Sequence, residues 1–184
     1  MQVSSLSIIE LLNGKLLEFP DLVDSLRKKD YDFLELLEKW MKEIETILKN
    51  NRISECAAIA GYRSKIIAPL FDESQKRSVK KRQLKLASEI MYELQDTVLS
   101  VIKPHETKVN EARDLLIHLL SIVKQSTSLK YTDETNFQEF ILSIWKLCSS
   151  HDQLKQGTIK ILTLISQMDA LRIIAEEIEI VEWR

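Results

Sequence analysis

Residues 32–50 read DFLELLEKWMKEIETILKN, and this stretch decides the fold class. Its large apolar side chains recur every three or four positions, which is the spacing of one face of an α-helix. The members of this face are Phe33, Leu37, Trp40, Met41, Ile44, Ile47 and Leu48. Asp32 and Glu35 place negative charge in the first turn, where the helix dipole favours it. We therefore expect an amphipathic helix that ends at Asn50 and Asn51 and buries one face in a core.

The composition extends this expectation to the whole chain. The 184 residues are 45% hydrophobic and include only three glycines and three prolines, too few for the frequent turns of a strand-rich fold. The sequence predicts an all-α protein, a single helical bundle of about seven or eight helices over residues 1–184. Short helices are expected in residues 1–30, long central helices in residues 31–128 and further helices in residues 129–184.

Several residues mark the expected helix boundaries. Ser7 with Glu10 has the spacing of a capping box and opens the first helix. The other expected breaks are Pro20, Asn50–Asn51, Phe71–Ser74, Pro104, the loop from Gln125 to Asp133, and Ser149–Ser150. At the end of that loop, Thr132 or the acidic pair after it is expected to cap the next helix. From Leu154 a further helix face runs to Val181. Residues 179–183, which are rich in β-branched and aromatic side chains, are also compatible with a short strand.

Charge and cysteine content narrow the function classes. The formal net charge is −2 with charges of both signs, which argues against nucleic-acid binding over the whole surface but not over a local patch. No apolar run approaches the ~20 residues that cross a bilayer, and Met1–Ile9 lacks the pattern of a signal peptide. Cys56 and Cys148 have no metal-type spacing. We expect a cytoplasmic protein with reduced thiols, no membrane partner, no metal and no cofactor.

Residues 53–71 resemble a helix-turn-helix segment. Gly61 would sit at the turn, with Ala57 four residues before it where the two helices touch. The resemblance implies that Arg63, Ser64 and Lys65 begin a DNA-recognition helix. The basic run that follows would add phosphate contacts; its members are Lys76, Arg77, Lys80, Lys81, Arg82 and Lys85. The alternative is that Ala57, Ala60 and Gly61 simply allow two helices to pack closely.

A second motif involves Arg113 and His118. The run Arg113-Asp114-Leu115-Leu116-Ile117-His118 is similar to the Arg-polar-three-residues-His signature of the HEPN-type ribonucleases, which are small helical bundles. That resemblance implies that Arg113 stabilises phosphate charge and that His118 acts as acid or base, usually across a dimer. The alternative is a structural role, in which Asp114 and His118, four residues apart, pair on one helix face.

The leading hypothesis is a non-enzymatic protein that works through protein–protein contact as an adaptor or regulator, with self-association as one form. The chain has abundant apolar helix surface and no coherent catalytic set. The chain has a basic run at residues 76–85 and an acidic C-terminus with Glu176, Glu177, Glu179 and Glu182. Such runs are solvated faces, contact each other, or form a docking surface for an acidic protein partner. Trp183 is a candidate partner contact if it is not packed inside.

Overall fold

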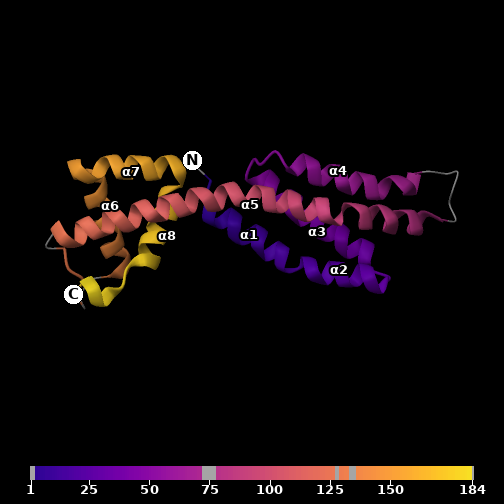
Figure 1. Ribbon diagram of the computed structural model, residues 1–184, viewed down its shortest axis with the longest axis horizontal. Coiled ribbons are helices and arrows are strands. Elements are labelled where there is room, and N and C mark those ends of the chain that lie inside the picture. The colour runs from indigo at the N-terminus through magenta and orange to yellow at the C-terminus, as the bar shows by residue number, and fades with distance from the viewer. Residues whose placement is uncertain (1–2, 72–77, 127–128, 133–135, 184) are drawn as a thin grey trace. The chain divides into compact units, whose positions relative to one another are not determined.

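The computed structural model describes residues 3–71, 78–126, 129–132 and 136–183, and within these residues it contains helices and no strand. The all-α prediction is confirmed. The α-helices are α1 (Ser5–Leu17), α2 (Phe19–Lys28), α3 (Phe33–Asn50), α4 (Cys56–Ile67), α5 (Val79–Ser126), α6 (Phe137–Ser150), α7 (Asp152–Leu164) and α8 (Gln167–Glu177) (Figure 1). Two short 3-10 helices are η1 (Ala68–Phe71) and η3 (Ile180–Trp183). In the described residues, no helix is both long enough and apolar enough to cross a membrane.

The chain divides into two compact units. The N-terminal unit comprises Ser7–Pro104, and the C-terminal unit comprises Met1–Leu6 together with His105–Arg184. Two helices, α1 and α5, contribute residues to both units. That residues 1–184 fold as one domain stays a prediction.

In the N-terminal unit α3 is the central element, packed against α2 and α4. The face predicted from its sequence is buried, apart from Ile47, which is half-buried. Trp40 shows how the core is closed: its ring lies 5.3 Å from that of Phe19, and its indole N–H donates to the carbonyl oxygen of Lys15 at 2.9 Å. Pro20 occupies the first turn of α2, as its missing N–H favours.

Helix α5 corrects the prediction of a break at Pro104, because it runs from Val79 to Ser126 with Pro104 inside it. An internal proline removes one helix hydrogen bond and costs about 3 kcal/mol. Burial on either side offsets that cost: Val101 and Ile102 precede the proline in the core of the N-terminal unit, and Val109 and Ala112 follow it among the buried residues of the C-terminal unit. Packing on both sides has outweighed the local preference for a helix end.

The turn predicted at Gly61 is wrong, because α4 is continuous through this residue. The glycine lies inside the continuous helix Cys56–Ile67, so no turn separates two helices there. A Cβ atom added to Gly61 would meet nothing within 4 Å, and Ala57 is exposed. The alternative prediction, that Ala57, Ala60 and Gly61 let two helices pack closely, is therefore also wrong. A helical glycine is disfavoured by only about 1 kcal/mol, which burial of Ile59 and Ile66 on the same helix offsets.

In the C-terminal unit, α6 packs against α7 and α8. Asn136 caps α6 by accepting the backbone N–H of Gln138 at 2.9 Å, whereas the acidic pair predicted as a cap lies outside the described residues. The helix predicted from Leu154 onward is interrupted, because Ile165 is extended and Ser166 forms a capping box with Asp169 that starts α8.

The C-terminal segment is helical, so the alternative of a short strand is wrong. Residues Ile180–Trp183 form η3, and the only described backbone bond from this segment to another part of the chain is from the N–H of Tyr131 to the carbonyl oxygen of Trp183, at 2.7 Å. The Trp183 ring packs edge-on against Phe140, 5.6 Å between centroids. One backbone bond and a buried ring fix this end of the chain without the ladder that a strand needs.

Helix α1 begins at Ser5, two residues before the predicted start, because a distant side chain supplies its cap. Asp169 of α8 is 2% exposed, and its carboxylate accepts the backbone N–H of Ser5 at 2.9 Å. The hydroxyl of Ser4 donates to the other carboxylate oxygen. The first N–H groups of a helix lack internal partners, so a buried acceptor extends the helix to where it lies.

Candidate functional site

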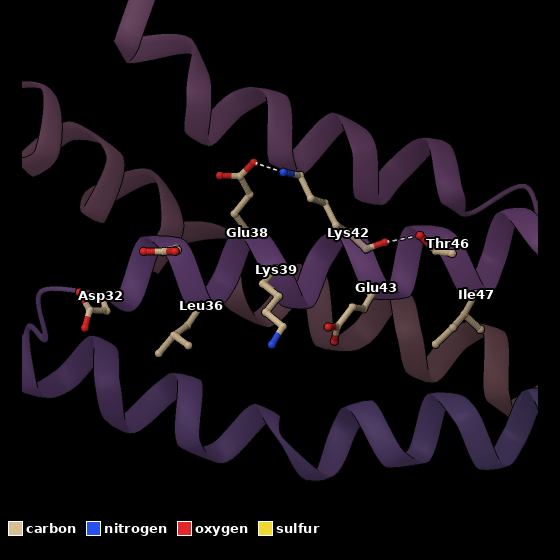
Figure 2. A pocket seen from close by; sticks show the side chains of 9 residues that line it. Asp32, Leu36, Glu38, Lys39, Lys42, Glu43, Thr46 and Ile47 are labelled. Carbon is tan, nitrogen blue, oxygen red and sulfur yellow. Dashed lines mark hydrogen bonds and ion pairs between the residues drawn. The ribbon is translucent and has the colours of Figure 1, made fainter.

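One hollow in the N-terminal unit is an open groove of about 990 Å³ along α3. It is lined by one face of that helix, and the lining residues are Asp32, Glu35, Leu36, Glu38, Lys39, Lys42, Glu43, Thr46 and Ile47. Figure 2 shows Glu38 and Lys42 on one side of α3 and Leu36, Lys39 and Glu43 on the other. We refer to this surface as the α3 groove.

The amphipathic pattern of α3 explains why this face is outward. Burial of the face from Phe33 to Leu48 turns the intervening residues to solvent, and most of these are charged. Two residues of the groove lining are apolar. Leu36 is 47% exposed, and Ile47 is half-buried at the other end of the groove. The groove thus has a charged lining with one apolar side chain near each end.

Two carboxylates of the groove, Glu38 and Glu43, are neutralised by ion pairs with lysines. Lys42 pairs with Glu38 at 2.7 Å across one helical turn, and Lys15 of α1 pairs with Glu43. The hydrogen bond with Lys15 is the main cause that lowers the pKa of Glu43 below 4.5. Partial burial acts against the charge on Lys15, but hydrogen bonds with Glu18 and Glu43 outweigh it and raise its pKa above 10.5.

In the N-terminal half of the groove, Asp32 and Glu35 are not paired with a cation among the described residues. Asp32 precedes the first turn of α3 and its carboxylate makes no capping hydrogen bond. Neither Asp32 nor Glu35 has an ion pair with any residue in the part of the chain that the structure describes. At this end of the groove, next to Leu36, two carboxylates thus lack an ion pair among the described residues, and the unpaired cation Lys39 lies one helical turn after Glu35.

A smaller hollow of about 320 Å³ joins the groove along its α1–α2 side. It shares Leu36, Lys39 and Glu43 with the groove and adds Lys15, Glu18, Asp21, Leu22 and Trp40. The exposed edge of Leu36 is therefore reached from both hollows.

The residues predicted for DNA recognition serve local structure in α4. Arg63 is half-buried and pairs with Glu45 of α3 at 3.1 Å, while its Nε atom has no partner. The Ser64 hydroxyl donates to the carbonyl oxygen of Ala60 at 2.9 Å. The ammonium group of Lys65 lies 5.5 Å from the ring centroid of Tyr62. Arg63 is thus paired with α3, and DNA recognition by these three residues stays a hypothesis.

The basic run is only partly described, because Lys76 and Arg77 lie outside the described residues. Lys80 lies over the Tyr31 ring at 3.8 Å and donates to the Tyr31 carbonyl oxygen at 3.2 Å. Lys81 is exposed and Arg82 half-buried on the first turns of α5, and Lys85 lies 3.8 Å from Glu89. DNA binding by this run stays a hypothesis.

Arg113 and His118 lie on one unbroken stretch of α5, where five residues correspond to a rotation of about 140°. The guanidinium of Arg113 is bound by Glu176, at 2.7 Å, and by Glu177 of α8. The Glu176 hydrogen bond is the main cause that raises its pKa. His118 is exposed. The helix does not bring the pair together within one chain, and Asp114 makes no described bond to His118.

The C-terminal residues pair inside their own unit. Glu182 binds Lys124 of α5 at 2.7 Å, as Glu176 and Glu177 bind Arg113. Trp183 is 6% exposed and packed against Phe140, so the condition for its role as a partner contact, that it is not packed inside, is not met. Large indole rings are more stable in a core than at a surface.

The remaining reactive side chains form no cluster. Among the described residues, no three His, Cys, Asp or Glu side chains lie close enough to hold a metal ion. Burial raises the pKa of the Cys148 thiol to about 11, which leaves it protonated and unreactive at neutral pH. His105 contacts the hydroxyl of Ser5 at 3.0 Å, but Ser5 is 4% exposed and inaccessible to a substrate.

The α3 groove was missed at the level of the sequence. One signal was present: Leu36 falls outside the buried face of an otherwise regular amphipathic pattern. Isolated exposed leucines are common on protein surfaces, however. Only the fold shows that Leu36 and Ile47 belong to one hollow.

The fold and this site define a helical protein with a charged surface groove. No family model matches the chain, and neither a curated protein nor a solved structure matches it.

Proposed function

We propose that this protein works through protein–protein contact and that the α3 groove receives a helical segment of the partner. The observation that carries the proposal is the placement of Leu36 and Ile47 inside a charged groove that follows one helix. Helix-in-groove recognition uses apolar anchors at helical spacing with polar contacts around them. The lining from Asp32 to Ile47 is about 22 Å long, which matches a partner helix of about four turns.

The form of the groove favours a macromolecule over a small ligand. Small-molecule sites are concave and enclose most of the ligand surface with apolar side chains. The α3 groove is lined by residues of a single helix, and six of its nine lining residues are charged. The lining contains carboxylates and lysines but no histidine or cysteine.

The proposal is tested by selection from an unbiased library of helical peptides displayed on phage, followed by affinity measurements on single substitutions. We expect selected peptides to bind the wild-type protein and to lose about tenfold or more in affinity with Leu36→Asp or Ile47→Asp. The matched control is Leu99→Asp on α5, because Leu99 is 45% exposed and Leu36 47%. Circular dichroism would verify that each variant keeps its helices.

Two results would contradict the proposal. One is that selection yields no peptide that binds above background. The other is that every selected peptide binds Leu36→Asp, Ile47→Asp and Leu99→Asp equally well, which would place the contact elsewhere on the surface.

A further inference from the structure

A second hollow adjoins the N-terminal end of the α3 groove, within the N-terminal unit. This cleft has a volume of about 500 Å³ and is lined by Tyr31, Asp32, Leu34, Glu35, Leu70, Val79, Lys80 and Gln83. Asp32 and Glu35 line both the cleft and the groove, so the two hollows adjoin each other at these residues. We refer to the second hollow as the anchor cleft.

The anchor cleft exposes more apolar surface than the groove. Leu70 is 58% exposed and Tyr31 85% exposed, while Leu34 and Val79 are half-buried in its wall. Phe71, next to Leu70 in η1, is 80% exposed. Exposed apolar area costs about 25 cal/mol per Å², so a cluster of such side chains is a favourable seat for one large apolar group.

Two carboxylates at the boundary of the cleft have no ion pair among the described residues. The single described cation in its lining, Lys80, is held by the ring and carbonyl oxygen of Tyr31. The carboxylates of Asp32 and Glu35 at the boundary with the groove have no ion pair among the described residues. The other groove carboxylates, Glu38 and Glu43, are already paired with lysines. Among the described carboxylates that line the groove and the cleft, Asp32 and Glu35 are thus the two without an ion pair.

We infer that the partner segment is a basic amphipathic helix that inserts one large apolar residue into the anchor cleft and places lysine or arginine one turn away, against Asp32 and Glu35. This inference rests on the proposed function. One helical turn separates residues four apart by about 6 Å, so an apolar anchor and a cation at that spacing reach the cleft and its boundary together. The rest of the helix lies along the α3 groove towards Ile47.

The probe for this inference is a designed, helix-favouring peptide of about 15 residues. It carries a central leucine with a lysine one turn before and one turn after it, and a twin peptide carries glutamate at those two positions. We expect replacement of the central leucine by alanine to weaken binding by about ten- to a hundredfold, from the transfer free energy of a leucine side chain. We expect the glutamate twin to bind more weakly than the alanine-substituted lysine peptide.

Substitutions in the protein test the same contacts from the other side. Leu70→Asp should weaken the lysine peptide about tenfold or more, whereas Leu142→Asp, at a leucine of α6 that is 51% exposed, should not. The double variant Asp32→Lys/Glu35→Lys should weaken the lysine peptide about tenfold and strengthen the glutamate twin. This exchange of preference should shrink at high salt, because exposed charge pairs are screened.

The outcomes separate this inference from the proposed function. Suppose that library-selected helices lose affinity with Leu36→Asp. The inference about the anchor cleft is then overturned if the lysine peptide fails to bind, or if it binds Leu70→Asp as tightly as the wild-type protein. It is also overturned if the glutamate twin binds wild-type protein as tightly as the lysine peptide. In both cases the proposed function stands. A library that yields no Leu36-dependent helix removes both.

Discussion

Gly61 shows how a single residue separates two interpretations of α4. It lies in mid-helix with open space where a Cβ atom would point. We expect Gly61→Ala to stabilise the protein by about 0.5–1 kcal/mol, because alanine loses less backbone entropy in a helix. Urea denaturation measures this change. A loss of stability would favour the turn that the helix-turn-helix interpretation requires.

Gly157 provides the comparison for that substitution. It also lies within a helix, but a Cβ atom there would come within 3.0 Å of Cδ2 of Leu119, a side chain that is only 6% exposed. We expect Gly157→Ala to gain less than Gly61→Ala, since part of the helix preference is offset by displacement of Leu119.

His105 should make stability depend on pH. Burial, followed by the nearby charge of Lys108, lowers its pKa below 6.5, and Asp169 acts in the opposite direction. The unfolded chain therefore binds more protons than the folded chain between the two pKa values. Stability should fall as the pH drops below about 6.5 and level off below the folded pKa.

The test of the His105 prediction compares the wild-type protein with His105→Gln from about pH 5 to about pH 8. Glutamine does not titrate and can still contact the Ser5 hydroxyl. We expect the difference in unfolding free energy between the two proteins to change across this range. A constant difference would show that His105 titrates alike in the folded and unfolded chains.

At the scale of the element, helix α1 depends on a residue far from it in sequence. Asp169→Ala removes the buried acceptor of the Ser5 N–H group and the capping box of α8. We expect a loss of about 1–3 kcal/mol, the cost of leaving buried donors unpaired. Asp152→Ala, at an exposed acidic residue in the first turn of α7, is the control and should cost less than about 1 kcal/mol. Equal losses in denaturation experiments would contradict this role for Asp169.

Helix α5 should be stabilised by removal of its proline. Pro104 is exposed, so its replacement by alanine removes little buried apolar surface. We expect Pro104→Ala to raise the unfolding free energy by about 1–3 kcal/mol, since alanine restores the backbone N–H and removes the clash with the preceding turn. Thermal unfolding followed by circular dichroism measures the change. A decrease would mean that the proline conformation itself is required at this position.

The elements also show how far the sequence predicts the fold. The boundaries of α3 follow from its apolar spacing and from Asp32 and Asn50, because these are local signals. The errors at Pro104 and Gly61 share one cause, since long-range packing outweighed a local preference of a few kcal/mol. The start of α1 could not be predicted because Asp169 lies 164 residues away. The groove was hidden for a related reason: which face of α3 stays open to solvent depends on how α2 and α4 pack against it.

At the scale of the whole molecule, α5 supplies core residues to both units. Leu94 and Val98 are buried in the N-terminal unit, and Leu116 and Val123 are buried in the C-terminal unit. Unfolding either unit would remove the packing that stabilises half of this helix. We therefore predict one cooperative unfolding transition for residues 1–184, as the single-domain expectation requires.

Tryptophan fluorescence can follow each unit separately. Trp40 is buried in the N-terminal unit, and Trp145 and Trp183 are buried in the C-terminal unit. A Trp145→Phe/Trp183→Phe variant reports on the first unit, a Trp40→Phe variant reports on the second, and circular dichroism follows all helices in both. In each variant we expect the fluorescence and circular dichroism midpoints to coincide in urea, because α5 couples the two cores. If fluorescence and circular dichroism diverge within one variant, the units unfold independently and the chain is two domains joined by shared helices.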